Sequence, residues 1–249
     1  LTLSGNNTFS GTIQMNAGVL RAGRATNAFG VGTALTIADG ATLDLYGYSE
    51  TIGSLSGVAG SYVDNTSGTG IYTLTVGDIS STSFGGVIRN TTGTLALTKQ
   101  GSGTLTLTGT NTFAGVTTIS AGTLQIGDGG TSGTLGSGSV TDDGILIFNR
   151  SDNVTWANSI SGSGSLTKLS GGTLTLTGTN SYGATTISAG TLQVGNGGTT
   201  GTLGSGAVTV SDPSATLLFN RSDAVSLSTL ASYTGGITGT GNVTALIGG

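Results

Sequence analysis

The sequence of 249 residues contains no histidine and no cysteine, and it has a single proline and a single tryptophan. Without histidine and cysteine, the usual serine or cysteine triads, zinc centres and haem sites cannot be built. No Gly-x-Ser-x-Gly nucleophile elbow occurs, and neither lysine completes a phosphate-binding loop. The sequence therefore predicts a protein that is not an enzyme, with no cofactor and no metal site.

Charge is also scarce, because 7 basic and 11 acidic side chains give a net charge of −4. No basic stripe is present, so nucleic acid is not an expected partner. No apolar run approaches the roughly 18 to 20 residues that span a bilayer, and residues 1–20 lack the layout of a signal peptide. We expect no membrane insertion by this segment, and we expect the chain to be a piece of a longer protein.

Glycine and threonine dominate what is present, with 48 and 47 residues. Both disfavour helix, whereas short runs in which Leu, Ile or Val alternates with Thr favour strands with one buried face. The composition predicts an all-β protein.

Internal repeats organise the chain. Residues 103–111 recur unchanged as residues 172–180, at an offset of 69, and residues 119–125 recur unchanged as 187–193, at an offset of 68. A third match joins 148–152 to 219–223 at an offset of 71, and an older copy begins at residue 1. We place the repeat copies near 1–96, 97–165 and 166–249.

Strands of comparable sequence start at Gly103, Gly122, Gly144 and Gly172, so three intervals of 19, 22 and 28 residues cover one copy. This spacing suits about three turns of a coil per copy, with Leu, Ile and Val inside, Thr and Ser outside, and Gly or Asn at the corners. The sequence predicts a right-handed parallel β-helix of about 12 coils, formed as a single domain over residues 1–249. A β-sandwich would show regular Asn-Gly or Asp-Gly hairpins, and a propeller would need more aromatic residues, so both rank lower.

The run over residues 97–115, continued by 119–125, resembles the autotransporter-associated β-strand repeat. A second copy covers residues 166–193, and the upstream segments 51–57, 74–77 and 84–88 are similar to what precedes that repeat. Such repeats are found in passenger regions of bacterial autotransporters and related giant surface proteins. The resemblance implies a secreted β-helix at the bacterial outer surface, which is adhesive or serves as a stalk.

A glycan-cleaving site requires two carboxyl groups about 5 to 9.5 Å apart. Asp142 and Asp143 are adjacent, so strand alternation sends them to opposite faces, and we expect both in a solvated loop. Glycan cleavage therefore remains a remote alternative. Calcium is not expected, since no nonapeptide repeat aligns acidic side chains.

Phe-Asn-Arg-Ser-Asp occurs twice and places Arg150 beside Asp152 and Arg221 beside Asp223. Residues i and i+2 share a strand face, so modest surface ion pairs are the default interpretation.

Two sets of outward side chains are weak candidates for surface contacts. The first set consists of threonines that alternate with buried leucines and would present hydroxyl and methyl groups to ice or a carbohydrate. The second set consists of apolar residues at equivalent strand positions that would contact a neighbouring chain. The candidates are Thr104, Thr106, Thr108, Thr173, Thr175 and Thr177 in the first set, and Ile147 and Leu218 in the second.

These observations favour a non-catalytic structural and adhesive β-helix segment of an extracellular bacterial protein. Its partner would be a host or matrix surface, either glycan or protein. As an alternative, the chain opens on a strand at Leu1 and closes at 246–249 with no capping residues, which favours end-to-end stacking into a filament.

Overall fold

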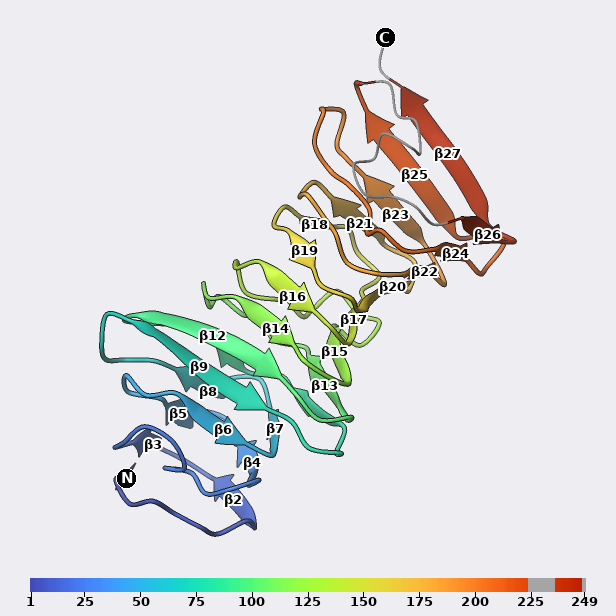
Figure 1. The fold of residues 1–249 in the computed structure, drawn as a ribbon. Helices are drawn as coiled ribbons and strands as arrows, with labels where there is room; N and C mark the ends of the chain where they lie inside the picture. Colours follow the sequence, from blue (N-terminus) through green and yellow to red (C-terminus); the bar gives the residue numbers. More distant parts are fainter. Residues whose placement is uncertain (224–235, 248–249) are drawn as a thin grey trace. The chain divides into compact units, whose positions relative to one another are not determined.

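The computed structural model describes residues 1–223 and 236–247, and this part of the chain contains strands, turns and bends but no helix (Figure 1). It forms two compact units. Unit 1 comprises Leu1–Gly127 and Ser132–Gly138, and unit 2 comprises Asp128–Thr131 and the chain from Ser139 onward.

The strands of unit 1 form three parallel sheets, which follow one another around each turn of a coil. The first sheet has the order β1 (Thr2–Leu3), β3 (Val19–Ala22), β5 (Thr42–Asp44), β8 (Tyr62–Asp64) and β11 (Val87–Ile88). The second has the order β2 (Thr12–Met15), β4 (Ala34–Ile37), β7 (Ser54–Gly57), β10 (Thr82–Phe84), β13 (Thr104–Leu107) and β15 (Thr123–Ile126). The third has the order β6 (Glu50–Ile52), β9 (Ile71–Val76), β12 (Thr94–Lys99) and β14 (Thr117–Ile119).

Unit 2 is built in the same way. One sheet has the order β17 (Ile145–Asn149), β20 (Ser165–Leu169), β22 (Thr185–Ile187), β24 (Val208–Val210) and β26 (Ile237–Gly239). A second has the order β18 (Val154–Trp156), β21 (Thr173–Leu176), β23 (Thr191–Val194), β25 (Thr216–Arg221) and β27 (Asn242–Ile247). A short pair joins β16 (Val140–Asp142) to β19 (Ile160–Ser161).

Strand pairing within both units is parallel, which confirms the predicted all-β fold of stacked coils and rules out a sandwich of antiparallel hairpins. The described residues make about 11 turns, slightly fewer than the predicted 12. The difference arises because turns vary in length: Thr123 follows its partner Thr104 after a short turn, but Ile237 follows its partner Val208 after a much longer one. The right-handed sense of the coil stays a prediction.

The core is a set of aliphatic columns inside each coil. Leu35 pairs in register with Leu55, and Leu105 pairs with Leu124, and all four are buried. Burying an aliphatic side chain of this size stabilises a fold by about 1.5–3 kcal/mol. Alternation therefore fixes which face of each strand points inward, and parallel pairing stacks the inward side chains from turn to turn.

Close approach between turns requires glycine at particular corners. A Cβ atom on Gly109 would collide with the carbonyl oxygen of Gly86 one turn earlier, whereas a Cβ on Gly171 would meet nothing within 4 Å. We expect Gly109→Ala to lower the free energy of unfolding by about 1–3 kcal/mol, because the backbone of one turn must move. Gly171→Ala serves as the control and should be neutral or stabilise by up to about 1 kcal/mol. Chemical denaturation measures both, and equal effects would contradict the close-packing argument.

Candidate functional site

The two better preserved repeat copies form the same local pairings. In unit 1, β12 pairs with β14 and β13 pairs with β15. In unit 2, β20 pairs with β22 and β21 pairs with β23. The repeated sequence thus encodes strands that pair with each other across one turn, and its polar residues lie at that junction.

A buried asparagine joins three successive turns. The side-chain oxygen of Asn111 accepts a hydrogen bond from the N–H of Ile88 at 2.8 Å, and its Nδ2 donates to the carbonyl oxygen of Thr134 at 2.6 Å. The Thr134 hydroxyl accepts from the backbone N–H of Asn111 at 2.7 Å. Asn180 makes the corresponding contacts in unit 2, at 2.9, 2.6 and 2.6 Å. We call this arrangement the asparagine joint.

A buried lysine closes the corner after β12. Lys99 is 2% exposed, and its Nζ donates to the carbonyl oxygens of Gln100 at 2.5 Å, Gly101 at 2.8 Å and Ala121 at 3.4 Å. Lys168 holds the corner after β20 in the same way. Burial lowers the pKa of Lys168 to about 8, so this ammonium group keeps its proton at pH 7. Both lysines are structural and are covered by protein.

The two arginines of the repeated pentapeptide fasten a loop. Arg150 donates to both carboxylate oxygens of Asp152 at 2.8 and 2.6 Å, and to the carbonyl oxygen of Thr131 at 2.5 Å. Arg221 forms the same bidentate pair with Asp223 and donates to carbonyl oxygens of the corresponding glycine-rich loop. The arginine hydrogen bonds lower the pKa of each aspartate.

This arrangement corrects the expectation of modest surface pairs on a strand face. β17 ends at Asn149, so Arg150 and Asp152 belong to the following turn. In the second pair Arg221 is the last residue of β25, and Asp223 follows the strand. Arg150 is only 9% exposed, and its guanidinium is engaged by the loop as well as by the carboxylate. The pairs therefore fix loop conformation.

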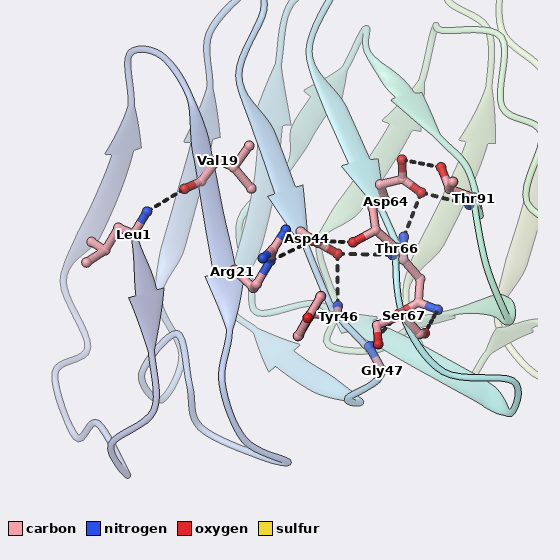
Figure 2. A network of polar contacts seen from close by, with 11 residues as sticks. Leu1, Val19, Arg21, Asp44, Tyr46, Gly47, Asp64, Thr66, Ser67 and Thr91 are labelled. Atoms are coloured by element: carbon pink, nitrogen blue, oxygen red, sulfur yellow. Dashed lines mark hydrogen bonds and ion pairs between the residues drawn. The ribbon is translucent and has the colours of Figure 1, made fainter.

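A polar network that the sequence analysis missed lies beside β3, β5 and β8 (Figure 2). Asp44 and Asp64 are register partners on adjacent turns, and each is 1% exposed. Arg21 donates to Asp44 at 3.0 Å, and Arg89 donates to Asp64 at 2.7 Å. The column therefore carries two acidic side chains with an arginine at each end.

Both carboxylates of this network accept several hydrogen bonds from the protein. Asp44 accepts from Arg21, from the N–H of Tyr46, and from the N–H and hydroxyl of Thr66. Asp64 accepts an equivalent set that includes the N–H and hydroxyl of Thr91. Two carboxylates on adjacent turns resemble a glycosidase pair, but these are buried and saturated with donors. The spacing between Asp44 and Asp64 in the sequence equals the length of one turn of the coil. The sequence alone does not give that turn length, so the pairing of the two aspartates could not be predicted.

Asp142 corrects a second expectation. Asp143 is exposed and accepts from Ser163, but Asp142 is fully buried at the end of β16. Its Oδ1 accepts from the N–H of Gly144 at 3.1 Å, whereas its Oδ2 has no partner. Burial raises the pKa of Asp142 to about 6, with a smaller contribution from the charge of Asp143. The two neighbouring carboxyl groups thus lie in different environments, one buried and one exposed.

The predicted surface candidates occupy several environments. Thr175 is only 8% exposed, so the middle residue of the second threonine tract is largely covered. The other candidates are half-buried at outward strand positions or at strand ends: Thr104, Thr106, Thr108, Thr173, Thr177, Ile147 and Leu218. Their use as contact residues stays a prediction.

Unbroken threonine columns come instead from strands that the sequence analysis did not single out. The members of each column are register partners on successive turns, at the usual strand spacing of about 4.8 Å. The column of unit 1 is Thr51, Thr75, Thr98 and Thr118. The column of unit 2 is Thr167, Thr186, Thr209 and Thr238, with Ile147 before it. All of these threonines are exposed or half-buried.

A shallow groove of about 630 Å³ crosses several turns of unit 1. It is lined by small residues of three corners, among them Gly57, Gly85 and Gly109, and by no ionisable side chain. The groove therefore offers backbone groups and the hydroxyls of Ser83, Thr108, Thr110 and Ser132 as hydrogen-bonding partners, but no charged group.

Residues 1–223 and 236–247 show neither a cluster of metal ligands nor a membrane-spanning helix. No three His, Cys, Asp or Glu side chains gather there into a metal site. No helix in those ranges has the length and apolar composition needed to cross a bilayer.

Comparisons with known proteins agree with this architecture. Residues 1–22, 97–126 and 166–194 match the passenger-associated-transport-repeat family, which confirms the resemblance inferred from the sequence. A stretch of 73 residues is 53% identical to the Adhesin BmaC autotransporter of Brucella suis biovar 1 (strain 1330). That stretch is 29% of this chain and 2% of the relative, so the chain spans a small part of that protein. No solved structure matches the chain.

Proposed function

The chain carries three passenger-associated-transport repeats, and we propose on that premise that it is a non-catalytic structural and adhesive segment of a bacterial protein exposed at the cell surface. The adhesin named in the comparison supports this proposal. Its partner would be a glycan or protein of a host or matrix surface.

The asparagine joint is the observation that carries the structural part. The side chain of Asn111 bonds to the turn before it and to the turn after it, and Asn180 does the same in unit 2. Lys99 and Arg150 are likewise engaged with backbone carbonyl groups of corners and loops. The characteristic polar residues of the repeat thus connect one turn to the next, as a stiff spacer requires.

The threonine columns support the adhesive part. They present uncharged hydroxyl and methyl groups in single file across four turns, on strands held rigid by their neighbours. A rigid, regularly spaced surface binds with little loss of conformational entropy.

A binding panel of immobilised matrix proteins and of neutral and acidic glycans tests this proposal. We expect the chain to bind at least one surface, and Thr98→Lys combined with Thr186→Lys to weaken that binding by tenfold or more. Thr112→Lys is the matched control, because Thr112 is exposed and lies outside both columns. Binding to no surface would contradict an adhesive role, and equal binding by all variants would contradict a role of the columns.

End-to-end assembly is a second candidate function, favoured by exposed apolar residues on β27 and next to β1. Val243 and Leu246 of β27 are 51% and 52% exposed, and Leu1 is 81% exposed beside an opening lined by Ile13 and Leu20. Sedimentation velocity at micromolar concentrations tests it. Filaments that dissociate in Val243→Glu would support assembly, and a single species with the mass of one chain would contradict it.

A further inference from the structure

Residues 24–32 form an irregular segment in unit 1, between β3 and β4. Four of its residues have left-handed backbone conformations: Thr26 with φ 65°, Asn27 with φ 57°, Gly30 with φ 84° and Gly32 with φ 68°. Side chains other than glycine disfavour this region, so Thr26 and Asn27 keep it only while surrounding contacts hold them. The segment is therefore shaped by its anchors.

Glu50 is a central anchor. Its Oε2 accepts a hydrogen bond from the N–H of Ala28 at 3.0 Å, and the side chains of Ala28 and Phe29 are completely buried beneath the segment. Glu50 itself is 2% exposed, and its Oε1 has no hydrogen-bond partner. A buried carboxylate with an unpartnered oxygen is unfavourable, whereas the protonated group is tolerated.

Few charges balance Glu50. Arg24, on the segment itself, is the source of the Coulombic contribution that favours the ionised form. Tyr48 precedes Glu50 by two residues, and the neighbouring strand β9 carries Tyr72, whose hydroxyl accepts from the N–H of Gly70. Burial outweighs Arg24 and the backbone N–H groups of Ala28 and Phe29, which favour the ionised form, and it raises the pKa of Glu50 to about 7.

We propose that residues 24–32 are a proton-operated latch, which is closed on unit 1 while Glu50 is protonated and opens when Glu50 ionises. Opening hydrates the carboxylate and releases Thr26 and Asn27 from their left-handed conformations. The β-strands of unit 1 stay paired, because the segment contributes no strand to any sheet.

The size of the effect follows from proton linkage. The closed form has a carboxyl pKa of about 7, and the open form has the ordinary value of 4.5. Protonation of Glu50 therefore makes its full contribution to the free energy of closure below pH 4.5. That contribution is lost as the pH rises through 7. Between pH 5 and pH 8 the equilibrium constant for opening should rise by about 70-fold.

Hydrogen exchange of backbone amides, corrected for the intrinsic dependence on pH, tests the latch. Protection of the amides of Ala28 and Phe29 should fall by about 70-fold from pH 5 to pH 8. Glu50→Gln should abolish this change, because its side chain is uncharged at both values. Asp142→Asn, which neutralises a buried carboxyl in unit 2, should leave the change in residues 24–32 intact.

Two outcomes would overturn the latch. Protection of Ala28 that is equal at both pH values in the unmodified chain would show that Glu50 does not hold the segment by its proton. Equal loss of protection in the strand amides of β4 and β7 would show unfolding of the unit in place of local opening. Both measurements use the unmodified chain, so they decide the question even if Glu50→Gln does not fold.

Discussion

Asn111→Ala and Asn180→Ala are each expected to lower the free energy of unfolding by about 2–5 kcal/mol. In the first variant, the buried N–H of Ile88 and the carbonyl oxygen of Thr134 both lose their partner. Each buried group left without a hydrogen bond costs about 1–3 kcal/mol. Because Asn180 makes the same contacts in unit 2, the two variants should lose similar amounts.

Denaturation in urea or guanidinium measures both variants. Asn196→Ala is the matched control, since Asn196 is an exposed residue of a glycine-rich loop and its replacement should change stability by less than about 0.5 kcal/mol. A loss below about 1 kcal/mol in Asn111→Ala and Asn180→Ala would mean that water replaces the amide, and the asparagine joint would then not connect the turns.

Much of this fold could be predicted, because alternation and repetition are local properties of the sequence. Leu105 and Leu107 alternate with threonines, and both are buried as the alternation requires. The verbatim recurrence of residues 103–111 indicates a stacked architecture, since a repeat that packs on its neighbours needs the same contacts each time.

The candidate site was less predictable, because register between turns depends on turn length. Thr75 and Thr98 become neighbours across one turn of the coil, and Asp44 and Asp64 become neighbours across a turn that is shorter. These turn lengths follow from corners and loops whose sequences differ from turn to turn. Local alternation identifies an outward threonine, but it does not show which threonine lies beside it on the next turn.

Burial of Asp142 escaped prediction for a related reason. An aspartate next to Asp143 suggests a solvated loop, yet the period of the strand places Asp142 inward with Val140. The second repeat copy indicates that this position is buried, because Val210 occupies the equivalent position and is also buried.

Asp142→Val is accordingly expected to stabilise the chain above pH 6. The carboxyl has a pKa of about 6 in the folded chain and an ordinary value of 3.8. The folded state therefore keeps a proton that the unfolded state releases, so this contribution to stability is present below pH 3.8 and is lost as the pH rises through 6. The free energy of unfolding falls by about 3 kcal/mol over this whole range of pH. A valine does not titrate, so the variant does not lose this stability.

The surroundings of Val210 indicate that a valine fits at position 142. Gly164 packs against the carboxyl of Asp142, and Gly241 packs against a methyl group of Val210 in the same way. Between pH 4 and pH 8 the unmodified chain should lose about 2 kcal/mol more stability in chemical denaturation than Asp142→Val, because pH 4 already lies above the ordinary pKa of 3.8. Asp143→Asn is the control and should keep most of the decrease, because that carboxyl is exposed. An unchanged decrease in Asp142→Val would assign the pH dependence to other groups, of which Glu50 is the first to test, since its folded-state pKa is raised to about 7.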